Sequence, residues 1–188
     1  MKYLVYVIAI ALFLGGCSYK NGAVSLKSYE SDYTGTVQKN KRGIYIEALK
    51  DIRADKRDIG YAEVKGKKDV TFRSDVDFVQ KYRYGLGRAL AMAGFNTDVS
   101  GKDASLTIEV YIKNIKIVYE DKTFDENLKG EIDLQVIVKK DAKTTTLDFK
   151  ERKGKWIAPS YDSRDIEPFL YTMFAQSIND IVSRLADY

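Results

Sequence analysis

The feature of this sequence that most limits its fold is a long run of alternating apolar and polar residues. The alternation changes phase once, at Asn114. Its apolar members are Leu106, Ile108, Val110, Ile112, Ile115, Ile117 and Tyr119. A period of two residues is typical of a strand with one buried face. We therefore predict one long strand in this region, with a bulge at Asn114.

Other segments share this period or a strand-like composition. They are Gly43–Leu49, Val70–Phe72, Phe95–Ser100, Ile132–Val138 and Thr145–Phe149. The last two flank the turn-like segment Lys140–Lys143, so we expect them to form a hairpin. The polar stretch Lys50–Gly60 is predicted to be a loop.

Two segments have helical spacing instead. The C-terminal one carries Ile166, Phe169, Leu170, Met173, Phe174, Ile178, Ile181, Val182 and Leu185, with Pro168 expected in its first turn. The other runs from Val76 to Ala93, after the capping residues Ser74, Asp75 and Asp77 and before a stop at Gly94. This order of elements predicts an α+β two-layer sandwich, with a mostly antiparallel twisted sheet and two helices on one face.

The N-terminus has the layout of a secretory signal. Met1 and Lys2 precede an uncharged run whose most apolar part, residues 4–14, is short for a membrane span. The following residues, Leu14, Gly15, Gly16 and Cys17, resemble the bacterial lipobox. That resemblance implies cleavage after residue 16, with diacylglycerol and an N-acyl chain on Cys17 and no other cofactor. Ser18 in the next position implies sorting to the outer membrane. The alternative is that Cys17 is merely a small residue ending an apolar helix.

Three regions follow from these features: a signal peptide at 1–16, a lipidated Cys with a flexible tether at 17–41, and a single α+β domain at 42–188. The tether prediction rests on the polar composition of Ser18–Lys41. Its tyrosines, with Val24 and Leu26, leave open that part of it docks on the domain or at the membrane interface.

The composition excludes the commonest catalytic chemistries. The chain has no His and one Cys, so His-based catalysis, His metal ligands and internal disulfides are absent. We therefore predict no catalytic residues and no metal site. The net charge of +4 is small and evenly spread, which argues against a nucleic-acid partner. The oligomeric state is not indicated.

Two motifs with a superficial link to catalysis fail on context. Gly85-Leu86-Gly87 lacks the third glycine of a nucleotide loop and lies inside a predicted helix, where it favours close helix-to-sheet packing or a kink. The carboxylates Asp51, Asp55, Asp58 and Glu63 are interleaved with basic residues. A pair of them could in principle hydrolyse a glycan, but this density of mixed charge is typical of a solvated loop.

Candidate partner contacts come from charge and aromatic residues. Basic clusters occur at Lys65, Lys67 and Lys68, at Lys139, Lys140 and Lys143, and at Lys150, Arg152, Lys153 and Lys155, the last beside Trp156 and Tyr161. If they converge on one end of the sheet, they would attract phosphates of lipid headgroups or glycolipids; otherwise they are solvated hairpin tips. Asp51 and Arg53, at a strand end, form either a partner site or a salt link that fixes the loop. An excess of tyrosines adds a compositional signal for protein contacts.

The segments IYIEALKDIRADKRDIGYAEV, AMAGFNTDV and DASLTIEVYIKNIKIVYE, after a lipobox, resemble the YajG family of bacterial lipoproteins. The resemblance implies an exported α+β lipoprotein domain without established catalytic residues, and some relatives are suspected of adhesion to host cells. We expect a non-enzymatic, membrane-anchored envelope lipoprotein that binds an envelope protein or glycolipid. A surface adhesin that binds a host surface is the alternative, and a carboxylate-based hydrolase is third. Whether the domain faces the periplasm or the cell surface stays open.

Overall fold

The computed structural model describes residues 23–30, 32–122, 125–158 and 161–188. The predicted signal peptide, the lipobox residues and Cys17 lie outside these residues. The elements are β1 (Ile44–Asp51), β2 (Asp58–Val64), β3 (Lys67–Arg73), α2 (Phe78–Met92), β4 (Leu106–Glu120), β5 (Leu128–Lys140), β6 (Lys143–Lys155) and α3 (Ser163–Ala186).

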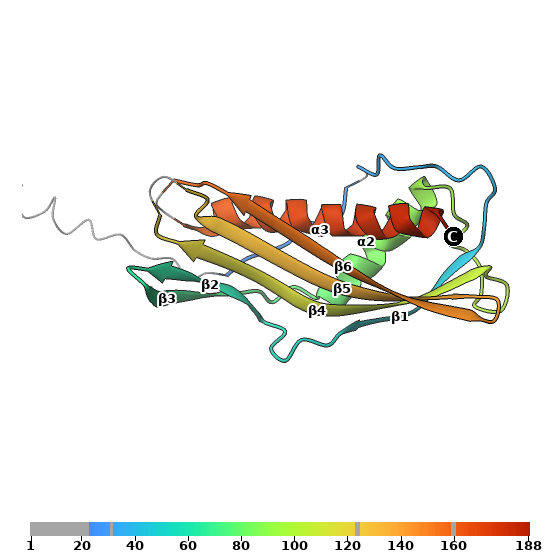
Figure 1. Cartoon of the computed structure of the whole chain (residues 1–188), viewed down its shortest axis with the longest axis horizontal. Helices are drawn as coiled ribbons and strands as arrows, with labels where there is room; N and C mark the ends of the chain where they lie inside the picture. The colour runs from blue at the N-terminus through green and yellow to red at the C-terminus, as the bar shows by residue number, and fades with distance from the viewer. Residues whose placement is uncertain (1–22, 31, 123–124, 159–160) are drawn as a thin grey trace, which may run out of the picture.

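The strands form one sheet in the order β3-β2-β4-β5-β6, and β1 also pairs with β4 (Figure 1). Strands β4, β5 and β6 form an antiparallel meander. Strands β1 and β2 both run parallel to β4, β1 along its first half and β2 along its last residues. Both helices lie on one face of this sheet, so the predicted α+β fold is confirmed. The predicted irregularity is also present, because the β4–β5 register shifts between Ile112 and Asn114.

The core lies between the sheet and the helices. It takes the alternate residues of β4 and β5 that the sequence pattern indicated, and the apolar stripe of α3. Tyr82 of α2 packs edge-on against Phe174 of α3, with ring centroids 4.8 Å apart, and shares a hydrogen bond with Ser177. Complete burial raises the pKa of Tyr82, so its hydroxyl stays protonated.

Helix α2 begins and ends as its sequence indicates. The Asp77 carboxylate accepts the Gln80 amide at 3.0 Å, and Gly94 follows the helix at a φ of +86°. Gly85 gives the close approach that we predicted, but toward a different neighbour. A Cβ at this position would lie 2.5 Å from Ile178 Cδ1 of α3 and 3.0 Å from Tyr29 Cβ. The missing side chain therefore serves helix-to-helix packing, and the expected helix-to-sheet contact is wrong.

Helix α3 begins earlier than we predicted. Asp162 caps it by accepting the Arg164 amide at 2.8 Å, which places Pro168 in the second turn of the helix instead of the first. The Thr172 hydroxyl donates to the Pro168 carbonyl at 2.9 Å, on the next turn.

Two strand predictions were wrong. The stretch predicted as one loop after β1 contains the start of β2, which pairs with both β3 and β4. Its backbone lies so close to β4 that a Cβ on Gly60 would be 1.7 Å from the Ile117 carbonyl oxygen. Conversely, Phe95–Ser100 forms no named strand, and Asn96 makes a single bridge to Gly43.

The N-terminal segment, which we define as residues 23–30 and 32–41, is a further correction. We predicted a flexible tether up to Lys41, but Val24, Leu26, Tyr29 and Tyr33 are at most 8% exposed. The Tyr29 hydroxyl donates to Asn179 of α3 at 2.8 Å. Burial, helped by the nearby Asp32, raises the pKa of Tyr29. The docking that the sequence left open therefore holds for this segment, and the folded domain begins before residue 42.

Candidate functional site

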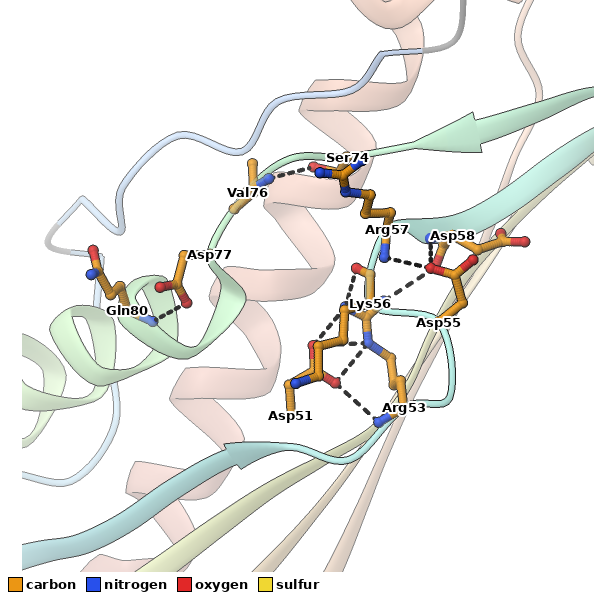
Figure 2. Close-up of polar contacts among 10 residues, drawn as sticks. All are labelled: Asp51, Arg53, Asp55, Lys56, Arg57, Asp58, Ser74, Val76, Asp77 and Gln80. Carbon is orange, nitrogen blue, oxygen red and sulfur yellow. Dashed lines mark hydrogen bonds and ion pairs between the residues drawn. The ribbon is translucent and has the colours of Figure 1, made fainter.

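Between β1 and β2 the sheet edge is interrupted by the loop Ile52–Arg57, which is held by Arg53 (Figure 2). Its guanidinium pairs with Asp51, with Nη2 2.7 Å from Oδ2 and Nε 3.0 Å from Oδ1. The same guanidinium donates to the carbonyls of Lys56 at 2.8 Å and Asp58 at 3.2 Å, and it lies over the Phe78 ring at 5.0 Å.

The Arg53 side chain is only 5% exposed and that of Asp51 6%. Their charges are directed at each other and at the loop backbone, so this pair fixes the path of the chain between two strands. Of the two interpretations open from sequence, the geometry corresponds to the salt link, since the pair offers little surface to a partner.

The loop carboxylates bond to the loop's own backbone. Asp55 accepts the amides of Arg57 at 2.9 Å and Asp58 at 3.2 Å, as Figure 2 shows. These two hydrogen bonds lower the pKa of Asp55. Asp58 in turn accepts the Gly60 amide at 2.8 Å. Glu63 lies apart from them, paired in register with Lys68 of β3 and Glu120 of β4.

The face of the sheet away from the helices, which we call the uncovered face, is polar and charged. Most of its charges form cross-strand pairs. These include Lys113 with Asp148, Lys129 with Glu120, Lys139 with Glu47 and Glu109, and Arg152 with Glu131. The hydrogen bond from Arg152 lowers the pKa of Glu131, whereas burial and the neighbouring Glu131 raise the pKa of Asp133.

One group on the uncovered face differs from these pairs. Lys68 of β3 and Lys116 of β4 both lie over the ring of Tyr61 of β2, with Nζ 5.2 Å and 5.6 Å from the ring centroid. Both lysines are exposed, and neither has a carboxylate within ion-pair distance in the described part of the chain. We call these three residues the Tyr61 patch.

Shallow hollows lie on either side of the Tyr61 patch. One, of about 390 Å³, is bordered by Tyr61, Lys68, Lys116 and the loop from Arg53 to Asp58. The other, of about 460 Å³, reaches Lys129 and Arg152. The patch thus presents an aromatic ring and two cations beside concave surface, which suits an anionic group carried on a larger molecule.

The predicted basic clusters do not form one surface. The β2–β3 turn with Lys65, and the last residues of β6 with Lys155, lie at the same end of the sheet, whereas Lys140 and Lys143 lie at the opposite end. Within the third cluster the strand alternation separates the side chains. Lys150 and Arg152 are on the uncovered face, and Lys153 and Lys155 point to the other side.

Two aromatic candidates have different positions. Trp156 is 51% exposed directly after β6. Tyr161 is half-buried, with its ring 4.5 Å from Tyr119 and its hydroxyl donating to Asp69 at 2.7 Å. Four other tyrosines, Tyr29, Tyr33, Tyr82 and Tyr119, are core residues, which accounts for part of the tyrosine excess.

Sequence reasoning missed three residues of structural or functional interest. Tyr61 and Lys116 of the patch lie on different strands and gave no local motif. Asn127 is completely buried, and its side chain pairs with the Ile157 backbone in both directions, accepting from its amide at 2.8 Å and donating to its carbonyl at 2.9 Å. It joins the chain entering β5 to the chain leaving β6.

Within the described residues, no three acidic or Cys side chains gather in a way that could hold a metal ion. No helix in this part of the chain has the length and apolar character needed to cross a bilayer.

The structure is thus an α+β domain with one helix-covered and one uncovered sheet face. A family model described as "Uncharacterized lipoprotein" matches residues 48–184. The chain belongs to this family of bacterial lipoproteins, which confirms the resemblance to YajG-like proteins and implies association with a membrane.

One solved structure supports the fold, and the fold alone. Protein XCC0632 from Xanthomonas campestris is similar with a TM-score of 0.53 at 11% identity, over 89% of this chain and 92% of that one. An uncharacterized protein of known structure has a TM-score of 0.44 at 12% identity, over 87% of this chain and 98% of that one. No curated protein matches.

Proposed function

We propose that this chain is a lipid-anchored protein of the bacterial outer membrane that binds another envelope component and catalyses no reaction. The anchor is Cys17, acylated after cleavage of the signal peptide. Family membership supports the anchor, because the family consists of lipoproteins. Since one acyl chain holds a protein only marginally and two or three hold it stably, the domain stays at its membrane.

The observation that carries the binding function is the Tyr61 patch. Two exposed lysines lie over one tyrosine ring, on a face where Lys113, Lys129 and Arg152 have carboxylate partners. Two ammonium groups at one exposed ring create a local excess of positive charge, which attracts anions. The partner is therefore an envelope component with phosphate or carboxylate groups, which the lysines bind while Tyr61 contacts its apolar part.

The binding function is tested by site-specific photo-crosslinking in growing cells. A photoreactive residue at Lys116 should give one reproducible product, and the same residue at Tyr84, which is 49% exposed on α2, should not. Lys68→Glu/Lys116→Glu should abolish a product formed from a photoreactive residue at Thr71, which lies opposite Tyr61. Lys102→Glu/Lys143→Glu makes the same charge change at the far end of the sheet and should preserve that product. Equal products from Lys116 and Tyr84, or none from either, would contradict the proposal.

The anchor is tested separately by Cys17→Ala. Mass spectrometry should find acyl chains on the wild-type N-terminus and none on the variant, which should also leave the outer-membrane fraction. The sequence alternative of adhesion to host cells gains no comparable support, since four of the tyrosines that suggested it are buried.

A further inference from the structure

The N-terminal segment fixes where the folded domain begins relative to the anchor. The Val24 amide donates to the Arg73 carbonyl at 2.9 Å, and the Ser74 hydroxyl donates to the Val24 carbonyl at 2.7 Å in a buried contact. The Ser25 amide donates to Glu167 of α3 at 2.8 Å. The chain is therefore attached to the domain from its first described residues onward, through bonds to β3 and α3.

This attachment shortens the reach of the anchor. A free chain from residue 17 to residue 41 could extend for roughly 80 Å, at about 3.4 Å per residue. With the N-terminal segment docked, only the six steps from Cys17 to Ala23 separate the acylated residue from the domain. Their greatest length is about 20 Å, so the domain cannot move far from the bilayer.

The point of attachment also selects which end of the domain is near the bilayer. Ala23 bridges Arg73, the last residue of β3, in a parallel pairing, so the chain reaches this bridge from the direction of the β2–β3 turn. Ser25 lies beside the second turn of α3. Figure 1 shows the start of this segment in the half of the molecule that contains the β2–β3 hairpin and the N-terminal turns of α3, whereas the C-terminus lies at the other end. Trp156, 51% exposed, follows β6 at the same end as the hairpin turn.

We propose that this end of the domain, with Trp156 and the hairpin turn at Lys65–Gly66, rests on the surface of the bilayer that holds the acyl chains of Cys17. The inference depends on the anchor in the proposed function and goes beyond it by naming a lipid contact of the folded domain. An indole ring is suited to the bilayer interface because it is apolar with one polar N–H group. Because the chain between Cys17 and the domain is short, even a weak contact of the domain with the bilayer surface is effectively intramolecular.

Charge adds to this contact. At this end Lys122 and Lys129 share Glu120, and Arg164 pairs with Asp162. Lys65, Lys67 and Lys155 are exposed, and none of them has a carboxylate within ion-pair distance among the described residues. The contact should therefore form on zwitterionic bilayers through Trp156 and be strengthened by anionic lipid.

The single Trp of the chain makes the test direct. Lipidated protein is reconstituted into vesicles of phosphatidylcholine with brominated acyl chains, which quench nearby indoles. Trp156 emission should be quenched and shifted to shorter wavelength, relative to the same protein in unbrominated vesicles and in buffer-exposed reference peptides. Adding anionic phosphatidylglycerol should increase the quenching, because Lys65, Lys67 and Lys155 have no carboxylate partners among the described residues.

Two variants provide matched controls. A Gly/Ser insertion of 24 residues between Gly22 and Ala23 keeps the anchor and should reduce the quenching. Trp156→Phe/Tyr84→Trp moves the indole to exposed α2 and should abolish the quenching. Unquenched wild-type Trp156 in floating vesicles, or quenching that the insertion leaves unchanged, overturns this inference while the anchor stands. Failure of every variant to float with vesicles overturns the anchor and the inference together.

Discussion

The two faces of the sheet are built from the same strands but follow different rules. On the helix-covered face, every second residue of β4 is apolar and completely or almost completely buried. On the uncovered face, the intervening residues are largely polar and form cross-strand charge pairs. Packing thus dictates one set of side chains, and contact with solvent dictates the other. The difference shows where function can be placed on this fold without loss of stability.

The largest expected effect is on the free energy of unfolding, when an apolar side chain is truncated on each of the two faces of β5. Leu134 is buried against the helices at 1% exposure, and Ile137 is half-buried on the uncovered face. Leu134→Ala should lower the free energy of unfolding by about 2–5 kcal/mol. Ile137→Ala should lower it by about 1 kcal/mol, because less apolar area is lost. Urea unfolding measures both, and equal losses would refute the contrast between the faces.

A second prediction concerns the strand β2, where the backbone itself is in close contact. Gly60 has a φ of +134°, and a Cβ would lie 1.7 Å from the Ile117 carbonyl oxygen. Gly60→Ala should therefore lower the free energy of unfolding by on the order of 3 kcal/mol, since β2 must move away from β4. Gly66, in the β2–β3 turn, also has positive φ (+73°) but no neighbour within 4 Å.

Gly66→Ala is the matched control for conformational strain without a clash. This substitution should lower the free energy of unfolding by about 1 kcal/mol. If the two variants unfold at the same urea concentration, the β2–β4 contact contributes nothing beyond the backbone conformation.

The elements that sequence predicts well are those whose burial repeats along the chain. Strand β4 and helix α3 have sustained periods of two and of three to four residues, and both were predicted in type and over most of their length. Strand β2 has no such pattern, because Gly60 and Ala62 are buried small residues that contribute little to an apolar period. Their burial depends on the close approach of β4, which is a tertiary feature.

The docking of the N-terminal segment was left open, and the Tyr61 patch was missed, for a related reason. Tyr29 bonds to Asn179, 150 positions away in sequence, and its neighbours follow no period. The patch brings together residues of β2, β3 and β4 through the register that sets Tyr61 opposite Thr71 and Val118. Composition showed the lysines and tyrosines but not which of them would meet, so the sheet pairing was needed to find the site.

The smallest predicted effect concerns two carboxylates of the uncovered face. Their contributions to the free energy of unfolding should depend on pH with opposite signs. Asp133 Oδ1 is buried and, among the described atoms, has no hydrogen-bond partner. Burial, followed by Glu131, raises its pKa above the ordinary value. The charged form is therefore disfavoured in the folded state, and this cost is present at neutral pH and disappears as the pH falls through the folded pKa to below the unfolded one.

Asp133→Asn should consequently have a higher free energy of unfolding than the wild type at pH 7, by a few tenths of a kcal/mol up to about 1 kcal/mol. This difference should vanish near pH 3. Asp148 on β6 is the control with the opposite sign, because the hydrogen bond from Gln135 and the charge of Lys113 lower its pKa. Asp148→Asn should destabilise the protein at pH 7, and this loss should disappear in acid. Urea unfolding from pH 3 to pH 8 measures both variants. If Asp133→Asn is instead destabilising at pH 7, the wild-type Asp133 carboxylate has a stabilising partner in the folded state. The charges of the uncovered face, that of Asp133 included, are then all neutralised by partners.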